Sequence, residues 1–313
     1  MINWSAVLGK GGSRDIARAI TAVENSSEIG AEILAQLPMP TAHVIGLTGP
    51  PGVGKSTSTS ALVGKLRANG RRVAVLAVDP SSPFSKGALL GDRIRMQEHA
   101  SDAGVYIRSL AARGHLGGLT ETTLDAVTVL SAAGFDSIIV ETVGVGQSEI
   151  DIASAADTTI VITAPGMGDG IQAAKAGILE IADIFAVNKA DRDGAEVAVR
   201  ELKSMISLAP GATGWVPPVI PTVATTGEGF EELTSAIADH LSYLQESGDL
   251  DRRREQRLRD YLVARAVAVA HRQIHDREAA GRLAHRVAGG DLSRASALEL
   301  LVSEFSVDEH QEN

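Results

Sequence analysis

Apolar positions follow two different spacings along the chain, and the change between them predicts where the architecture changes. In residues 1–40, Ile16, Ile20 and Val23 recur at the spacing of a helical face, and two prolines close the segment. From residue 43 the apolar residues gather instead in short β-branched runs, most of them separated by helical patterns. These runs predict seven strands, at 44–49, 72–79, 105–110, 137–144, 158–165, 184–191 and 219–225.

Strands that alternate with helices indicate an α/β fold with a doubly wound, mainly parallel sheet. The clearest of the intervening helices spans 120–133. There Leu124, Val127 and Leu130 form one apolar stripe, and Gly134 supplies a left-handed stop. No internal repeat interrupts this order.

The chain becomes strongly charged after Gly248, and we expect a long helix there, followed by a shorter helical tail to about Phe305. Apolar residues within 250–274 lie around more than one helical face, so one face should pack on the α/β domain and another on a second subunit. The interpretation is therefore a helical segment at 1–40, an α/β domain at 41–247 and a helical dimerisation arm at 248–313. A homodimer follows from the arm.

Composition narrows the classes of protein. The chain of 313 residues is 44% hydrophobic but only 3% aromatic, which suits a buried parallel sheet built from Ala, Val, Leu and Ile. Its net charge of −10 argues against nucleic-acid binding and against binding to an anionic membrane, since both need a basic surface. The chain has no cysteine and no apolar stretch long enough to span a membrane, so we expect a cytoplasmic protein.

A glycine-rich loop follows the first predicted strand and opens a helix. The stretch GPPGVGKS matches G-x-x-x-x-G-K-[ST] in the strand–loop–helix setting that this motif requires. Backbone N–H groups of such a loop turn inward around phosphate oxygens, Lys55 reaches the β- and γ-phosphates, and the Ser56 hydroxyl binds Mg²⁺. The loop predicts a nucleoside triphosphate as ligand. The residues expected to contact it are Gly49, Gly52, Val53, Gly54, Lys55, Ser56 and Thr57.

The sequence NKAD at the end of the sixth predicted strand indicates which base is bound. The Asp191 carboxylate can accept from guanine N1 and N2, which adenine does not offer. Asn188 would support the loop and contact guanine N7, and the Lys189 stem would lie over the ring. Further along, the backbone amide of Ala224 or Thr225 is a candidate donor to guanine O6.

Three acids are candidates for the metal side of the site. Glu141 ends an apolar strand at the place where most GTPases carry Asp, and it would hold Mg²⁺ through water, with the Gly144 amide sensing the γ-phosphate. Asp79 stands at another strand end and Asp92 in the segment that follows. Acids beside a triphosphate usually serve the metal, although a solvated loop explains Asp92 equally well.

The segment 162–177, ITAPGMGDGIQAAKAG, leaves an apolar strand through a glycine-rich loop with one acid, Asp169, and enters a predicted helix with one base, Lys175. By its residues alone it is a catalytic element, a docking element or a plain connection.

Other polar clusters give no indication of a catalytic or metal-binding site. His115 is interpreted as a surface histidine, His271 and His275 as part of a solvated or interface helix, and 252–254 as a solvated basic face.

The chain resembles the MeaB/ArgK-like GTPases, which belong to the SIMIBI class of P-loop GTPases and chaperone adenosylcobalamin-dependent methylmalonyl-CoA mutase. The resemblance spans the whole chain and rests on GLTGPPGVGKST, VDPSSP, GALLGDRIRM, RGHLGGLTETT, FDSIIVETVGVGQSEID and ILEIADIFAVNKAD, in that order. It implies that Asp79, Asp92 and Glu141 surround Mg²⁺. It also implies that 162–177 is a mobile segment that responds to the mutase, with Asp169 and Lys175 as its functional charged pair.

The leading hypothesis is therefore a slow, partner-stimulated GTPase that gates cobalamin loading and protects methylmalonyl-CoA mutase or a related acyl-CoA mutase. One alternative is a P-loop ATPase or kinase of amino-acid transport, against which the guanine motif argues. Another is a nucleotide-dependent binding module in which hydrolysis is incidental. GTP and ATP turnover with and without the mutase separates the three.

Overall fold

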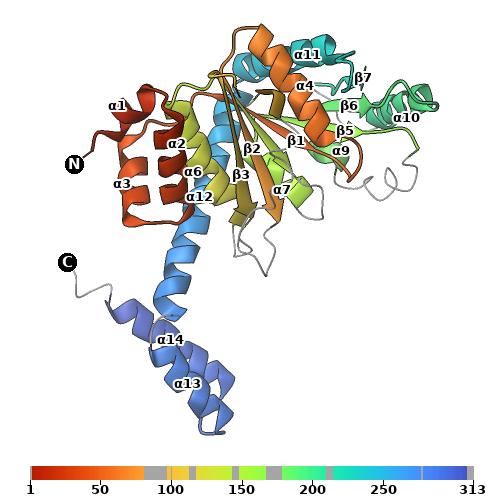
Figure 1. The fold of residues 1–313 in the computed structure, drawn as a ribbon. Helices are drawn as coiled ribbons and strands as arrows, with labels where there is room; N and C mark the ends of the chain where they lie inside the picture. Colours follow the sequence, from red (N-terminus) through yellow and green to blue (C-terminus); the bar gives the residue numbers. More distant parts are fainter. Residues whose placement is uncertain are drawn as a thin grey trace. The chain divides into compact units, whose positions relative to one another are not determined.

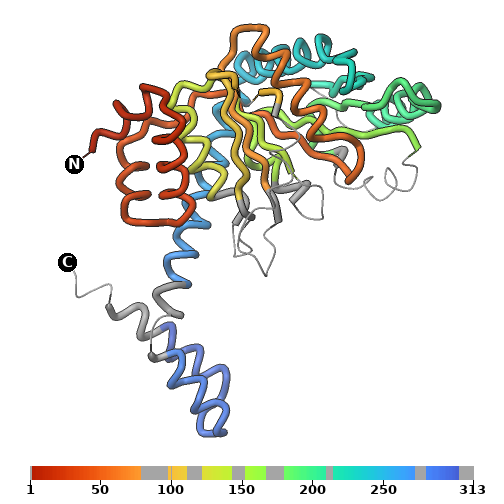
Figure 2. The backbone as a smooth tube through the Cα atoms, viewed as in Figure 1, coloured from red at the N-terminus to blue at the C-terminus, as the bar shows by residue number. Residues whose placement is uncertain are grey.

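A computed structural model describes residues 2–80, 97–99, 101–112, 118–142, 148–166, 178–208, 214–275 and 278–308. The tube in Figure 2 follows the chain from α1 near the N-terminus to the C-terminal helices. Contacts within the chain divide it into two compact units, residues 1–259 and 260–313. Each unit is described by itself.

Seven strands form the sheet of the first unit, in the order β3-β2-β4-β1-β5-β6-β7. Every pairing is parallel, so the expected doubly wound, mainly parallel sheet is confirmed. All seven strands lie where the apolar runs predicted them. They are β1 (His43–Thr48), β2 (Val73–Pro80), β3 (Val105–Ala112), β4 (Ser137–Thr142), β5 (Thr158–Thr163), β6 (Ile184–Asn188) and β7 (Val219–Thr222).

Helices cover both faces of this sheet (Figure 1). The N-terminal segment forms three helices, which pack on α6, and a 3-10 turn, η1 (Gln97–His99), precedes β3. The α-helices of the described residues are α1 (Trp4–Gly9), α2 (Ser13–Glu24), α3 (Glu28–Gln36), α4 (Lys55–Ala68), α6 (Gly118–Ala132), α7 (Ser148–Ala155), α9 (Ile178–Ile181), α10 (Ala195–Leu208), α11 (Phe230–Ser247), α12 (Asp249–His275), α13 (Glu278–Ala288) and α14 (Arg294–Asp308).

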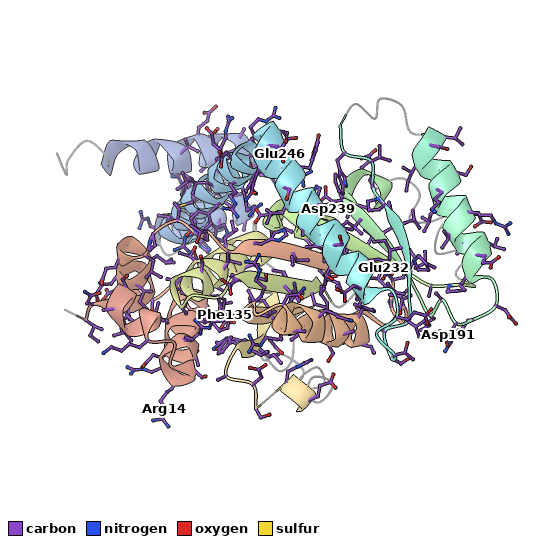
Figure 3. All side chains as sticks on the ribbon, turned by 90° about the horizontal axis from the view of Figure 1, so that it is seen from above. Arg14, Phe135, Asp191, Glu232, Asp239 and Glu246 are labelled. Atoms are coloured by element: carbon purple, nitrogen blue, oxygen red, sulfur yellow. The ribbon has the colours of Figure 1, made fainter. Side chains whose placement is uncertain are left out.

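The core is split by the pleat of the strands, because successive side chains point to opposite faces. In β2, Val73 and Val75 pack under α4, whereas Ala74 and Leu76 pack against the N-terminal helices and α6. The helix α11 shows the matching division between its own faces. Its Leu233, Ile237 and Leu244 are buried, while Glu232, Asp239 and Glu246 line the exposed side (Figure 3).

A buried ionic network fastens the start of α12 to the amino ends of β5 and β6. Asp157, fully buried, accepts from Arg254 at 2.9 Å and from Arg257 at 3.0 Å, and also from the Val44 amide. Burial acts to raise the pKa of the Asp157 carboxyl, but these donors and charges outweigh it and hold the pKa below its usual value. The expectation that 252–254 forms a solvated face is therefore wrong for Arg254.

Asp183 closes the same network one strand further along. It accepts from Arg253 at 3.0 and 3.1 Å, and His240 lies 3.3 Å from its Oδ1 atom. Burial opposes ionisation, yet the neighbouring His240 and Arg253 keep the pKa of Asp183 below its usual value. A threonine hydroxyl, that of Thr158, joins His240 to a second buried histidine, His43.

The second unit holds the later part of α12 together with α13 and α14, which pack on one another. Exposed apolar side chains are frequent on these helices, among them Leu262, Val263, Leu298 and Val302. The predicted domain limits and the dimerisation role of this arm stay predictions. Among the described residues, no helix is both long and apolar enough to cross a bilayer.

Candidate nucleotide-binding site

The loop between β1 and α4 has backbone geometry that only glycine tolerates at two positions. Gly49 has φ +145°, and a Cβ there would lie 2.1 Å from the carbonyl oxygen of Ile162. Gly54 has φ +96°, and a Cβ there would lie 2.6 Å from Nδ2 of Asn188. The two glycines thus let the loop run close to β5 on one side and to β6 on the other.

Lys55 begins α4 and is buried under this loop. Its ammonium donates to the carbonyl oxygens of Gly49 at 2.7 Å and Pro50 at 3.1 Å, so the charge lies across the inner side of the loop. The N-terminus of α4 adds first-turn N–H groups, which have no acceptor within the helix, and positive potential at the same place. This combination attracts an anion, as the motif predicts.

The metal side of the site is built from α4 and the end of β4. Glu141 is only 4% exposed, and its two oxygens accept from two hydroxyls of α4. Ser56 donates to Oε1 at 2.6 Å, and Thr59 donates to Oε2 at 2.8 Å. A hydroxyl and a carboxylate in contact form a set of hard oxygen donors, which suits Mg²⁺. No motif pointed to Thr59, because its position is not part of the phosphate-loop pattern.

Asn188 ties the phosphate loop to the loop after β7. Its Nδ2 donates to the carbonyl oxygen of Val53 at 2.7 Å, and its Oδ1 accepts from the Ala224 amide at 3.0 Å. Lys189, at φ +59°, donates to the carbonyl oxygen of Gly52 at 2.6 Å. Both side chains therefore hold loop backbone in position, which is the supporting role expected for Asn188.

Asp191 stands at the open side of this arrangement. It is exposed, at the periphery of the view in Figure 3, and among the described residues no group donates to its carboxylate. The Ala190 amide, next to it, is held by Thr222 at 3.0 Å, so the backbone that carries the acid is fixed. Thr225 is exposed on the neighbouring loop. An acid with free lone pairs on a fixed backbone is what recognition of guanine N–H groups requires.

Other predicted site residues are only partly covered by the structure. Asp79 lies near the carboxyl end of β2, paired with Ala111 of β3. Val53 is buried and Thr57 is exposed. Asp92, Gly144, Asp169 and Lys175, as well as His115, lie outside the described residues. In the part of the chain that is described, no three His, Asp or Glu side chains come together as a metal-binding group.

The described site residues thus meet at the carboxyl edge of the sheet, around the first strand. In open α/β sheets, ligands bind at this edge, where the strand order reverses. Phosphate-loop, metal-side and base-side residues come from β1, β4 and β6, respectively, with the loop after β7 added. The arrangement suits a guanine nucleotide with its phosphates on the N-terminus of α4.

Comparisons with known proteins agree with this geometry. The family model described as methylmalonyl-CoA mutase-associated GTPase MeaB matches residues 16–279. A Pyrococcus horikoshii protein named as a GTPase is 46% identical over 310 residues, covering 95% of this chain and 96% of its own. A mouse protein, named methylmalonic aciduria type A homolog, mitochondrial, is 35% identical over 269 residues, covering 83% of this chain and 65% of its own.

One solved structure is similar over nearly the full length. The protein in it is named a LAO/AO transport system kinase. It is 27% identical, with a TM-score of 0.69, and the match covers 97% of this chain and 96% of that one. The expected P-loop fold is thereby confirmed.

Proposed function

The chain is a GTPase of the MeaB family, and from this premise we propose that it serves as a nucleotide switch for an adenosylcobalamin-dependent acyl-CoA mutase. The mutase named in the family description, methylmalonyl-CoA mutase, is the first candidate for the partner. The observation that carries the guanine assignment is the bridge through Asn188. It joins the phosphate loop to the loop after β7, beside the free carboxylate of Asp191.

In this proposal each side of the site has a separate task. The amides of the phosphate loop and Lys55 bind and orient the phosphates, and Asp191 with the Thr225 amide selects guanine over adenine. The Ala224 amide, the other candidate donor to guanine, already donates to Asn188. The Asn188 contacts keep the phosphate loop and the loop after β7 at a fixed separation, and Lys189 holds the phosphate loop to the end of β6. Base and phosphates are therefore bound as one unit. Positioning of this kind lowers the entropic cost of the reactive geometry.

Mg²⁺ fits the donors on the metal side. Ser56 and Glu141 offer a hydroxyl and a carboxylate, and Asp79 and Asp92 are the further acids expected there. When bound, the ion neutralises charge that develops on the phosphate oxygens. The Ser56 hydroxyl donates a hydrogen bond to Glu141, which fixes its orientation and leaves the lone pairs of the serine oxygen available to the metal.

Control by the partner is assigned to the segment 162–177. Its match to the family's partner-responsive loop, together with its glycine content, supports a switch that brings Asp169 and Lys175 to the phosphates only when the mutase docks. Basal turnover is then slow and stimulated turnover fast. Gated loading of adenosylcobalamin, and protection and reactivation of the mutase, would use this change of state.

The test is to measure GTP and ATP turnover with and without the mutase. The proposal expects GTP turnover that rises when the mutase is added, with little ATP turnover in either case. The similar solved structure is named a transport system kinase, but that name describes the other protein. If this chain were a kinase of that type, it would use ATP about as well as GTP. A pure binding module would give GTP turnover that the mutase does not change.

We also propose a homodimer through the C-terminal helices, supported by the exposed apolar side chains of α12 and α14. A chain shortened to end at Arg259 keeps the network around Asp157 and should run as a monomer that binds GDP. Full-length protein should sediment as a dimer at micromolar concentration. A monomeric full-length protein contradicts the proposal.

A further inference from the structure

The hydroxyl of Thr59 has an unusual partner for a helical threonine. In this chain, Thr21, Thr128 and Thr234 each donate to the carbonyl oxygen four residues earlier in the helix. This is the ordinary arrangement, because that carbonyl is the nearest acceptor. Thr59 instead donates to Oε2 of Glu141, 82 residues away in sequence.

The hydrogen bond from Thr59 lowers the cost of burying Glu141. Its carboxylate is almost completely buried, and a buried carboxylate without donors carries a large desolvation cost. The strand end here carries Glu rather than the Asp of most GTPases, and the extra methylene adds a torsion that must be fixed. Ser56 holds Oε1 and Thr59 holds Oε2, so the plane of the carboxylate is set from two points one helical turn apart.

We propose that Thr59 is a positioning residue of the GTPase site, acting through Glu141 on Ser56. The hydrogen bond from Thr59 to Oε2 of Glu141 keeps Oε1 of Glu141 in contact with the Ser56 hydroxyl. The lone pairs of Ser56 Oγ then stay oriented towards the Mg²⁺ position. Groups behind a metal ligand commonly change metal affinity by about 10- to 100-fold when they are removed. This inference rests on the proposed metal role of Ser56, and the experiment separates the two.

The variants of Thr59 separate the loss of its hydroxyl from a change in side-chain volume. Thr59→Val removes the hydroxyl with little change in volume, and Thr59→Ser keeps it. Ser58→Ala is the matched control, because the Ser58 hydroxyl is equally buried in the next position and has no hydrogen-bond partner among the described residues. Ser56→Ala tests the metal site itself. Thr59→Ala is a second route to removing the hydroxyl if the valine variant does not fold.

Two readouts report on the metal rather than on activity alone. One is GDP affinity as a function of Mg²⁺ concentration, and the other is Mn²⁺ binding to the GDP complex measured by electron paramagnetic resonance. Thr59→Val should raise the half-saturating Mg²⁺ concentration by about 10-fold or more, with GDP affinity at saturating Mg²⁺ changed much less. Thr59→Ser should restore it to within about twofold, and Ser58→Ala should match the parent protein.

Three results overturn the inference. If Thr59→Val keeps the parent Mg²⁺ dependence while Ser56→Ala loses it, the metal site stands and Thr59 has no positioning role. If Thr59→Ser is as impaired as Thr59→Val, packing rather than the hydrogen bond matters. If Ser56→Ala leaves the Mg²⁺ dependence unchanged, the metal assignment fails and the inference fails with it.

Discussion

The two edges of the sheet use polar residues in opposite ways. At the carboxyl edge, Asn188 and Lys189 hold loop backbone while the Asp191 carboxylate faces solvent. At the amino edge, Asp157 is fully buried and its oxygens are taken by arginines of α12. The first edge keeps binding groups available, and the second pairs its buried acids, Asp157 and Asp183, with arginines. One edge is therefore suited to a ligand and the other to stability.

The largest test of this contrast is Asp157→Asn. Removing the carboxylate charge leaves Arg254 and Arg257 partly or wholly buried without their counter-charge, which typically costs about 3–5 kcal/mol. Denaturant unfolding should show that loss in the free energy of unfolding, while GDP affinity of the folded protein stays near that of the parent. A variant that loses GDP affinity without losing stability would mean that the amino edge is part of the binding site.

Arg252→Ala is the control for that variant, because its side chain is 72% exposed and pairs with Asp249 at the surface of the same helix. Exposed pairs contribute roughly 0–1 kcal/mol. A loss as large as that of Asp157→Asn would show that any charge change in α12 destabilises the unit.

Asp191→Asn tests the carboxyl edge in the same way. The change replaces an acceptor with a donor facing guanine N–H groups and should weaken GTP binding by roughly 2–4 kcal/mol. Because Asp191 is exposed, the free energy of unfolding should not change. Calorimetric titration with GTP and with ATP gives both affinities, and an unchanged GTP affinity would remove the guanine assignment.

A smaller effect is expected from pH at the amino edge. Burial lowers the pKa of His43 to about 4, partly offset by the charge of Asp157, so folding favours the neutral imidazole. As the pH falls below about 6.5, the ordinary pKa of histidine, His43 takes up a proton in the unfolded chain but stays neutral in the folded protein. The free energy of unfolding therefore falls as the pH drops towards 4.

Between pH 7 and pH 5 this contribution amounts to about 2 kcal/mol of lost stability. For His43→Gln, the free energy of unfolding should therefore fall by about 2 kcal/mol less between pH 7 and pH 5 than it does for the parent protein. Denaturant unfolding at several pH values measures this difference. The same pH dependence in the variant and the parent protein would show that His43 does not cause it.

The same contrast explains what the sequence could predict. Strands and the phosphate loop follow from local patterns, since β-branched runs, GPPGVGKS and NKAD each lie within a few residues. Asp157 and Arg254 are 97 residues apart, and nothing in the run of arginines distinguishes a buried partner from a solvated face. Thr59 was missed for a similar reason, because its acceptor is Glu141 on another element. Contacts between residues that are far apart in the sequence cannot be predicted from local sequence patterns.

The most direct test of the partner-responsive switch is the rate of GTP turnover by the parent protein and by Lys175→Ala, each with and without the mutase. We expect equal GTP affinity and nearly equal basal rates, with most of the stimulation by the mutase lost in the variant. Equal losses in both rates would make Lys175 an ordinary active-site residue. Full stimulation of the variant would contradict the claim that this segment is the partner-responsive switch.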